Sequence, residues 1–303
     1  MGTLRAIGAR SLAAALVLAA GLATAASAQS LQPCDRACLR GFVDGYLSAL
    51  AAHDSARLDV AAGVSYTENG RAATLGEGLW RSAGTPHTYR DYALDPETGG
   101  AAILTALDEN GGVTQLFVRL AIVGRRIAEV ETIVVRPGEE RWFAPENLAR
   151  LSTLFATPVP PAERHSRAEL VAAANAYFTA VETEGTPAFV QAPFAPGMNR
   201  IENGLQTTNV TANPRSDRHR WSAAEQLERA AYAGTVVTER RFPLVDSEHG
   251  VAVGIAVFRF AGENAPTLLL AEAFKVTGGK LREIRAIVRG IPKGTGAGWP
   301  APP

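Results

Sequence analysis

The stretch RIAEVETIVVR, at residues 126–136, returns almost position for position as KLREIRAIVRG at residues 280–290. In both, apolar and β-branched residues alternate with charged ones, a pattern typical of a β-strand with one buried face. Each copy closes a segment of about 120 residues in which the same features occur in the same order. The chain is therefore an internal repeat, and its fold is the fold of one half, formed twice.

A long amphipathic helix opens each half. CLRGFVDGYLSALAAHD (residues 38–54) and RAELVAAANAYFTAVETEG (residues 167–185) carry apolar residues at three- and four-residue spacing. Strands separated by turns rich in Gly, Asn and Asp follow, near residues 87–95, 100–108, 113–123 and 126–136, and near 234–245, 250–261, 266–277 and 280–290. One helix followed by antiparallel strands predicts an α+β fold in each half, with the sheet curved around the helix.

The domain organisation follows from composition. Residues 1–28 carry two arginines, an apolar run and Ala-Ser-Ala at 26–28, the pattern of a cleaved signal peptide. We expect a first domain at 31–155, a proline-rich linker at 156–166, a second domain at 167–295 and a tail at 296–303. The composition is typical of a bacterial GC-rich genome, so we expect a periplasmic or secreted protein.

Charge and motifs argue against several functions. Lysine plus arginine and aspartate plus glutamate number 30 each, so the basic excess of a nucleic-acid binder is missing. Beyond residues 1–28 no apolar run is long enough for a membrane span. Motifs for nucleotide binding, serine hydrolysis and zinc proteolysis are also missing. We therefore expect no cofactor, no metal, no nucleic acid and no membrane. The ligand that the resemblance described below implies is a small, largely apolar organic molecule.

The two cysteines, Cys34 and Cys38, lie four residues apart at the start of the first helix. In an oxidising compartment such a pair is a candidate disulfide. Helical spacing would put the two Cα atoms near the long end of the bridgeable range, and a slightly unwound helix start would shorten it. Two free thiols are the alternative, and a metal site is disfavoured because no third cysteine exists.

Each half resembles the NTF2-like superfamily, also called the SnoaL-like or cystatin-like α+β cone, which includes ketosteroid isomerase, scytalone dehydratase and polyketide cyclases. A narrower resemblance rests on the stretches CDRACLRGFVDGYLSALAAHD, YTENG, GEGLW, ETIVVR and GTGAGW. Through them the chain resembles an exported fungal and bacterial family described only as a domain of unknown function. The superfamily resemblance implies an apolar pocket at the open end of each cone. It also implies that the two cones pair through their sheets as a pseudo-dimer within one chain, itself a monomer or homodimer.

Glu-Asn-Gly occurs in both halves, at residues 68–70 and 202–204, between a short helix and the sheet. Because Asn and Gly both tolerate positive φ, one interpretation is a shared turn. The other is that Glu68 points into the pocket, where desolvation would raise its pKa and make it an acid or base near neutrality.

The strand HTYRDY, at residues 87–92, offers a second set of acid–base groups. Alternation puts His87, Tyr89 and Asp91 on one face. That face is either a catalytic constellation in the pocket or an outer surface packed against the other domain. Likewise, Glu131 on the closing strand is either part of a carboxylate pair with one raised pKa or a group on the sheet surface. Arg285 takes its place in the second half, so the halves have diverged.

We interpret the protein as a cofactor-independent enzyme of the lyase or isomerase type, with a binding protein and a structural partner as alternatives. Turnover is assigned to the first half, because arginines such as Arg240 and Arg285 cannot easily shuttle a proton. The candidate catalytic residues are Glu68, His87, Tyr89 and Glu131. The candidate substrate-binding residues are Tyr46, Asn69, Trp80, Arg90, Arg200, Glu202, Asn203 and Arg240.

Overall fold

A computed structural model of the chain describes residues 1–2 and 34–299. The predicted signal peptide, apart from residues 1–2, and the last four residues of the predicted tail lie outside the described residues. None of the described helices is long and apolar enough to cross a membrane.

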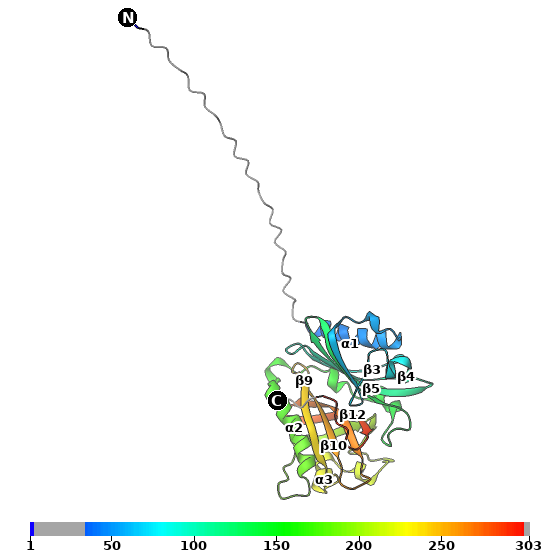
Figure 1. The fold of residues 1–303 in the computed structure, drawn as a ribbon. Coiled ribbons are helices and arrows are strands. Elements are labelled where there is room, and N and C mark those ends of the chain that lie inside the picture. The colour runs from blue at the N-terminus through cyan, green and yellow to red at the C-terminus, as the bar shows by residue number, and fades with distance from the viewer. Residues whose placement is uncertain (3–33, 300–303) are drawn as a thin grey trace. The chain divides into compact units, whose positions relative to one another are not determined.

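The first repeat runs from α1 to β6 and combines one long helix with a six-stranded sheet (Figure 1). Its elements are α1 (Arg36–Ala51), η1 (Ser55–Arg57), β1 (Val60–Glu68), β2 (Arg71–Ala72), η2 (Gly78–Arg81), β3 (Ala83–Asp95), β4 (Gly100–Glu109), β5 (Gly112–Val123) and β6 (Arg126–Val135). The strand order is β2-β1-β6-β5-β4-β3, and β1 pairs with β6 in parallel while the other neighbours are antiparallel.

The second repeat runs from α2 to β12 and has the same topology. Its elements are α2 (Arg167–Thr183), β7 (Phe194–Glu202), β8 (Leu205–Gln206), η6 (Asp217–Arg220), α3 (Ala223–Glu228), β9 (Val236–Asp246), β10 (Val251–Arg259), β11 (Thr267–Thr277) and β12 (Lys280–Ile291). The strand order β8-β7-β12-β11-β10-β9 repeats that of the first sheet. Between the repeats lie η3 (Pro145–Arg150), η4 (Thr153–Ala156) and η5 (Pro161–Glu163). The α+β class is thus correct, and the internal repeat is structural as well as sequential.

The helices lie against their sheets as their apolar spacing predicts. Tyr46 and Tyr177 occupy equivalent positions on the buried faces of α1 and α2. The capping residues are Asp35, which accepts a hydrogen bond from the N–H of Cys38 at 2.8 Å, and Ser166, which forms a capping box with Glu169. Each helix packs mainly on the last four strands of its own repeat, so one face of each sheet is covered by a helix.

The predicted disulfide between Cys34 and Cys38 is present. The two Cα atoms are 5.2 Å apart, well inside the range that a disulfide spans. This distance is short because Cys34 precedes the N-cap residue Asp35 and so lies outside the helix. An extended N-cap thus supplies the unwound helix start that the spacing requires.

The other faces of the two sheets pack on each other. One apolar cluster contains residues of both sheets. Among its members are Leu104, Phe117 and Ile133 of the first sheet and Leu244, Ile255, Leu269 and Ile287 of the second. The interface between the repeats is therefore a sheet-on-sheet core, with each helix on the far side of its own sheet (Figure 1).

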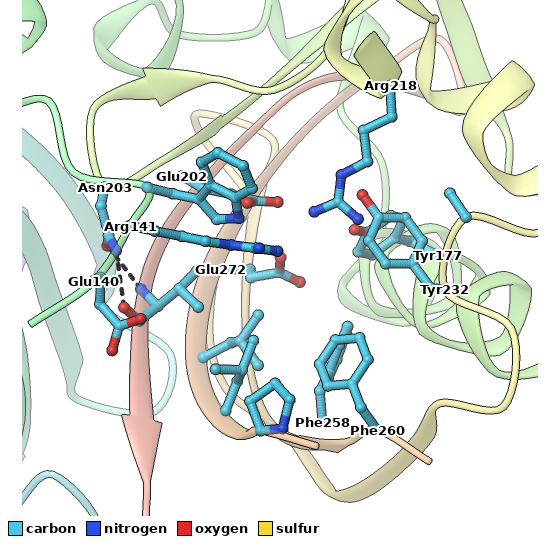
Figure 2. Close-up of a pocket in the computed structure, with 16 residues that line it drawn as sticks. Glu140, Arg141, Tyr177, Glu202, Asn203, Arg218, Tyr232, Phe258, Phe260 and Glu272 are labelled. Atoms are coloured by element: carbon cyan, nitrogen blue, oxygen red, sulfur yellow. Dashed lines mark hydrogen bonds between the residues drawn. The ribbon is translucent and has the colours of Figure 1, made fainter. Parts of the chain in front are cut away.

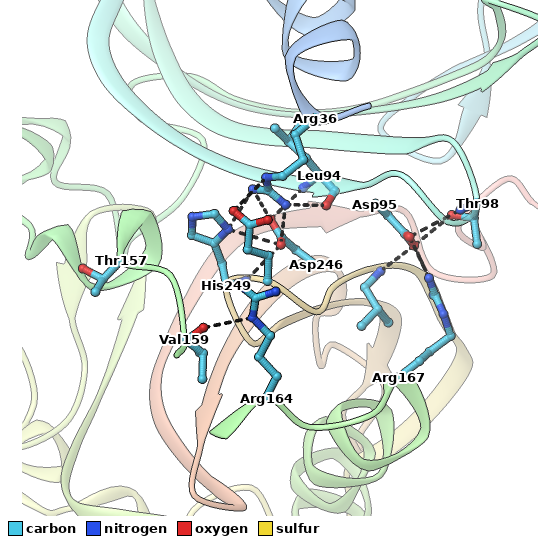
Figure 3. Close-up of polar contacts among 12 residues, drawn as sticks. Arg36, Leu94, Asp95, Thr98, Thr157, Val159, Arg164, Arg167, Asp246 and His249 are labelled. Atoms are coloured by element: carbon cyan, nitrogen blue, oxygen red, sulfur yellow. Dashed lines mark hydrogen bonds and ion pairs between the residues drawn. The ribbon is translucent and has the colours of Figure 1, made fainter. Parts of the chain in front are cut away.

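Two aspartates join the repeats reciprocally at the ends of β3 and β9. Asp95 accepts from Arg167 of α2 at 2.6 Å, and Asp246 accepts from Arg36 of α1 at 2.7 Å. Asp95 also accepts the backbone N–H of Val245 at 3.1 Å, and Asp246 accepts the backbone N–H of Leu94 at 3.0 Å (Figure 3). The repeats are therefore related by approximate two-fold symmetry, in which each helix start binds the strand end of the other repeat.

Candidate active site in the second repeat

Both Glu-Asn-Gly segments form tight turns within the sheets, which supports the turn interpretation for Asn and Gly. Asn69 and Asn203 have φ of 52° and 45°, and the glycines that follow have φ of 75° and 77°. Each asparagine side chain accepts a backbone N–H from the closing strand, at 2.8 Å from Val134 and 2.9 Å from Val288. The segments end the strands β1 and β7, which the sequence did not predict, rather than lying between a short helix and the sheet.

Each turn is covered by the segment that follows the closing strand of the other repeat. A Cβ atom at Gly70 would collide with the carbonyl oxygen of Gly296, and one at Gly204 would collide with that of Ala144. The N–H of Ala144 also donates to the carbonyl of Asn203 at 2.9 Å. Glycine is therefore required by close approach as well as by φ, and the crossing carries residues 139–147 of the first repeat onto the second.

Glu68 lies on the helix-facing side of the first sheet, where it holds a short helix in place. Its carboxylate accepts from the hydroxyl of Tyr66 at 3.0 Å and from the N–H of Leu79, at the start of η2, at 3.1 Å. Tyr46 and Trp80 pack edge to face beside it with ring centroids 5.3 Å apart, and both are fully buried. Three of the predicted site residues thus meet here, but two large aromatic rings fill the space.

The other three predicted catalytic residues lie away from Glu68. His87 contacts Asp108 at 2.8 Å on an exposed part of β3 and β4. Tyr89 donates to Asp91 at 2.6 Å, and Asp91 pairs with Arg285 of the second repeat. These two contacts place Tyr89 between the sheets.

Glu131 also lies between the sheets. Its carboxylate pairs with Arg119 at 2.9 Å and with Arg241 of the second repeat. The structure therefore does not bring the four predicted catalytic residues into one site. Tyr89 and Glu131 belong to an ion-pair network at the sheet interface.

The predicted substrate-binding arginines differ in surroundings. Arg90 donates to the hydroxyl of Thr105 at 2.7 Å on the neighbouring strand. Arg240 donates to Thr179 at 3.1 Å and pairs with Glu182, both on α2. These two guanidinium groups hold strands and helices together, whereas Arg200 lies inside the second repeat.

A cavity of about 580 Å³ opens inside the second repeat (Figure 2). One end is apolar and is lined by Phe258, Phe260, Pro266, Leu268, Leu270 and Val288. The other end is polar and is lined by Glu140, Arg141, Trp142, Tyr177, Glu202, Asn203, Arg218, Tyr232 and Glu272, with Ala231 beside them. A volume of this size suits a small organic molecule with an apolar body and a polar group.

Arg200 organises the polar end from behind the cavity wall. Its side chain is 1% exposed, and its Nε lies 2.7 Å from the carboxylate of Glu202. It also donates to the hydroxyl of Tyr177 at 3.1 Å and to the hydroxyl of Tyr232. Because Tyr177 accepts this bond, its own proton remains available to a ligand. Burial raises the pKa of Tyr177 well above 10, so the hydroxyl stays protonated.

Glu272 is a titratable group in the cavity that the sequence interpretation missed. It lies in the middle of β11, is 1% exposed, and lines the cavity (Figure 2). Burial raises the pKa of Glu272 to about 8. The negative charge of Glu202 adds to this increase, and the positive charge of Arg200 opposes it. Its Oε2 has no hydrogen-bond partner among the described residues. The signal was a single carboxylate on the inward-facing side of the apolar strand TLLLAEAFKVT, residues 267–277.

The roof of the cavity comes from the segment after β6. The ring of Trp142 lies under the guanidinium of Arg141 at 4.3 Å and packs against His219 at 4.8 Å. His219 is buried, which lowers its pKa to about 4, so its ring is neutral at physiological pH. Among residues 34–299, no group of three or more His, Cys, Asp or Glu side chains is placed to hold a metal ion.

The fold and the cavity define a tandem α+β protein whose second repeat encloses a cavity with one apolar and one polar end. Residues 163–288 match the profile of a family described as Domain of unknown function (DUF8021). The match starts in η5 and ends in β12, so it includes Glu202, Arg218 and Glu272. No curated protein is similar enough to the chain to count as a match.

Proposed function

We propose that the second repeat is an acid–base enzyme of the lyase or isomerase type that acts on a small, largely apolar organic molecule. The supporting observation is Glu272, a buried carboxyl group with a free oxygen that faces a cavity with one apolar and one polar end. With a pKa of about 8, this group changes between acid and base close to neutral pH. The assignment moves turnover from the first repeat, where Tyr46 and Trp80 occupy the interior, to the second.

The chemistry follows from the groups around Glu272. As a base, its carboxylate removes a proton from a carbon next to a carbonyl group, and the electron pair of the C–H bond moves to the carbonyl oxygen. The hydroxyl of Tyr177 and the guanidinium of Arg218 line the same polar end and can donate to that oxygen. In a substrate with a β,γ double bond, return of the proton to the γ-carbon, while the electron pair on oxygen re-forms the carbonyl group and the double bond shifts to the α,β position, completes an isomerisation. Loss of a β-hydroxyl group, which leaves as water after protonation, completes a dehydration.

We also propose that the repeats are two NTF2-like cones, near residues 31–155 and 167–295, joined by the linker at 156–166 into an intrachain pseudo-dimer. The identical strand orders and the helix on one face of each sheet support this. Export is part of the proposal, because the disulfide between Cys34 and Cys38 is a bond of oxidising compartments.

Proton transfer can be tested before the substrate is known. The protein is incubated in D₂O with a panel of cyclic ketones and β-hydroxyketones, and ¹H NMR follows both exchange of the α-protons and loss of water. We expect exchange above the buffer rate with at least one compound, and we expect Glu272→Gln to abolish it. Glu68→Gln is the matched control in the first repeat and should exchange normally. Exchange that is equal in wild type and Glu272→Gln would contradict the assignment.

A further inference from the structure

Two arginines at the polar end of the cavity form no ion pair with any of residues 34–299. Arg141 on the roof and Arg218 in η6 both line the cavity. Neither guanidinium makes an ion pair or a hydrogen bond with any residue in the described range 34–299. By contrast, Arg200, behind the same wall, pairs with Glu202 at 2.7 Å.

Aromatic rings hold the two guanidinium groups in place. Arg141 lies over Trp142 with 4.3 Å between the guanidinium carbon and the ring centroid. Arg218 lies 5.7 Å from the same centroid and 5.1 Å from that of Tyr232. Stacking on a ring face orients a guanidinium without neutralising its charge, so the N–H edges remain available to a ligand.

The segment that carries Arg141 is fixed on both sides. Before it, Glu139 pairs with Arg289 at 2.6 Å, and Glu140 accepts the N–H of Gly290 at 2.5 Å. After it, the N–H of Ala144 donates to the carbonyl of Asn203 at 2.9 Å. The roof is therefore docked on the second repeat, and it presents Arg141 to the cavity from the first repeat's chain.

Carboxylates also line this end, and they do not cancel the two arginines. Glu202 is paired with Arg200. Glu140 accepts the backbone N–H of Gly290, which leaves its charge in place, so it offsets one of the two arginines. Burial raises the pKa of Glu272 to about 8, so at pH 7 most Glu272 carboxyl groups are protonated and a minority are ionised. The polar end thus has an excess of positive charge that a ligand can satisfy.

We infer that the natural ligand of the second repeat is a carboxylate attached to an apolar ring or chain. Its carboxylate lies between Arg141 and Arg218 above Trp142, and its apolar body lies against Phe258 and Leu268. The planar guanidinium fork matches the two oxygens of a carboxylate. This inference rests on the proposed function, since it places the anionic group at the polar end that Glu272 faces.

Binding to simple probes tests the inference without a known substrate. The probes are benzoate, 2-naphthoate and cyclohexanecarboxylate, each against its primary amide, titrated into the full-length protein by calorimetry and by tryptophan fluorescence. We expect the acids to bind and the amides to bind at least tenfold more weakly. Arg141→Ala and Arg218→Ala should each raise the Kd of the acids by about 10- to 100-fold, the scale of one charge-assisted interaction. Arg220→Ala, in the same short helix but outside the cavity lining, is the matched control and should leave the Kd unchanged.

The outcomes separate this inference from the proposed function. Carboxylate binding that depends on both arginines, without any proton exchange, upholds the anion site and contradicts the enzyme. Proton exchange with neutral ketones, together with equal affinity for acids and amides, contradicts the anion site and upholds the enzyme. Absence of acid binding at millimolar concentration, or tighter binding of phenyl phosphate than of benzoate, overturns the carboxylate assignment.

Discussion

The interiors of the two repeats differ at positions where their folds coincide. Tyr66 on β1 and Arg200 on β7 occupy equivalent sites. Tyr66 pairs with Val130 of β6 and Arg200 with Ile284 of β12, and these two residues match in the repeated closing strands. Val118 on β5 and Glu272 on β11 are also equivalent, because they pair with the matching residues Thr132 and Ala286 of the closing strands. One repeat fills its centre with apolar and aromatic groups, and the other keeps a cavity with buried charges. Burial of those charges costs free energy, so a functional role for the second repeat accounts for them better than stability does.

The sheet interface shows a second difference, in the sign of its charges. Glu131 of β6 pairs with Arg241 of β9, while the equivalent Arg285 of β12 pairs with Asp91 of β3. The two contacts are related by the approximate two-fold symmetry, but their charges are inverted. Two copies of the first repeat would bring Glu131 against Asp91, and two copies of the second would bring Arg285 against Arg241. Charge inversion therefore favours pairing of unlike repeats.

The largest expected effect is on catalysis. Glu272→Gln should lower kcat by about 10²- to 10⁴-fold, the usual loss when an acid–base group is removed. Glu68→Gln should change kcat by less than about threefold. The substrate is any compound that shows exchange in the D₂O assay. A reversed order of the two variants would return the active site to the first repeat.

The next effect is on the sheet interface. Glu131→Gln should lower the free energy of unfolding by about 3 to 5 kcal/mol, because Arg119 and Arg241 would lose a buried partner. Glu131→Arg should cost more. Glu129→Gln, on the same strand and also paired with Arg119, is the control; its carboxylate is 40% exposed, so we expect a loss below about 1 kcal/mol. Urea denaturation gives all three values, and equal losses for Glu131→Gln and Glu129→Gln would count against a buried network.

The pH dependence of stability sharpens the comparison of the interiors. The pKa of Glu272 is about 8 in the folded protein against an ordinary value of 4.5, so the folded state holds the proton longer than the unfolded state. Its contribution to stability is complete below pH 4.5 and is lost as the pH rises through 8. The Glu272→Gln variant has no such loss. We therefore expect its free energy of unfolding to exceed that of the wild type by about 2 to 4 kcal/mol near pH 9. Parallel stability curves for the two proteins between pH 5 and 9 would show that this carboxyl group does not titrate with a raised pKa.

The smallest effect concerns the two turns. Gly204→Ala and Gly70→Ala should each cost about 1 to 3 kcal/mol, because positive φ and a facing carbonyl both oppose a Cβ. Gly111→Ala, with positive φ but no neighbour within 4 Å, should cost less. Only Gly204→Ala should also weaken carboxylate binding, because it displaces Ala144 and with it the roof. Equal binding by the Gly70 and Gly204 variants would mean that the roof does not depend on this contact.

Much of the fold could be predicted from sequence because its signals are local. The two long helices α1 and α2, four strands in each half and the disulfide follow from spacing and turn residues. Strands β1 and β7 were missed because VAAGVSYTE and FAPGMNRIE carry glycine and small residues in place of a clear alternation. The Asn-Gly turns were predicted, but not what covers them.

The candidate site could be predicted only in part, because it depends on contacts between distant segments. Glu202, Asn203 and Arg200 were predicted as binding residues and do lie in or behind the cavity wall. Glu272 was missed because β11 reads as a buried strand in which one charge has no neighbour in sequence. Tyr89 and Glu131 face the other sheet, and a single half-sequence does not say which face of its strands a second sheet will cover.

The crossed segments give the two repeats different histories during synthesis. Residues 139–147 precede the second repeat in the chain, so the segment that covers the turn at Asn203 is synthesised before that repeat. The first repeat has no such advantage, because Trp299, which donates to Thr67 at 2.9 Å, is made 232 positions later. The half that is translated first is thus the last to be completed.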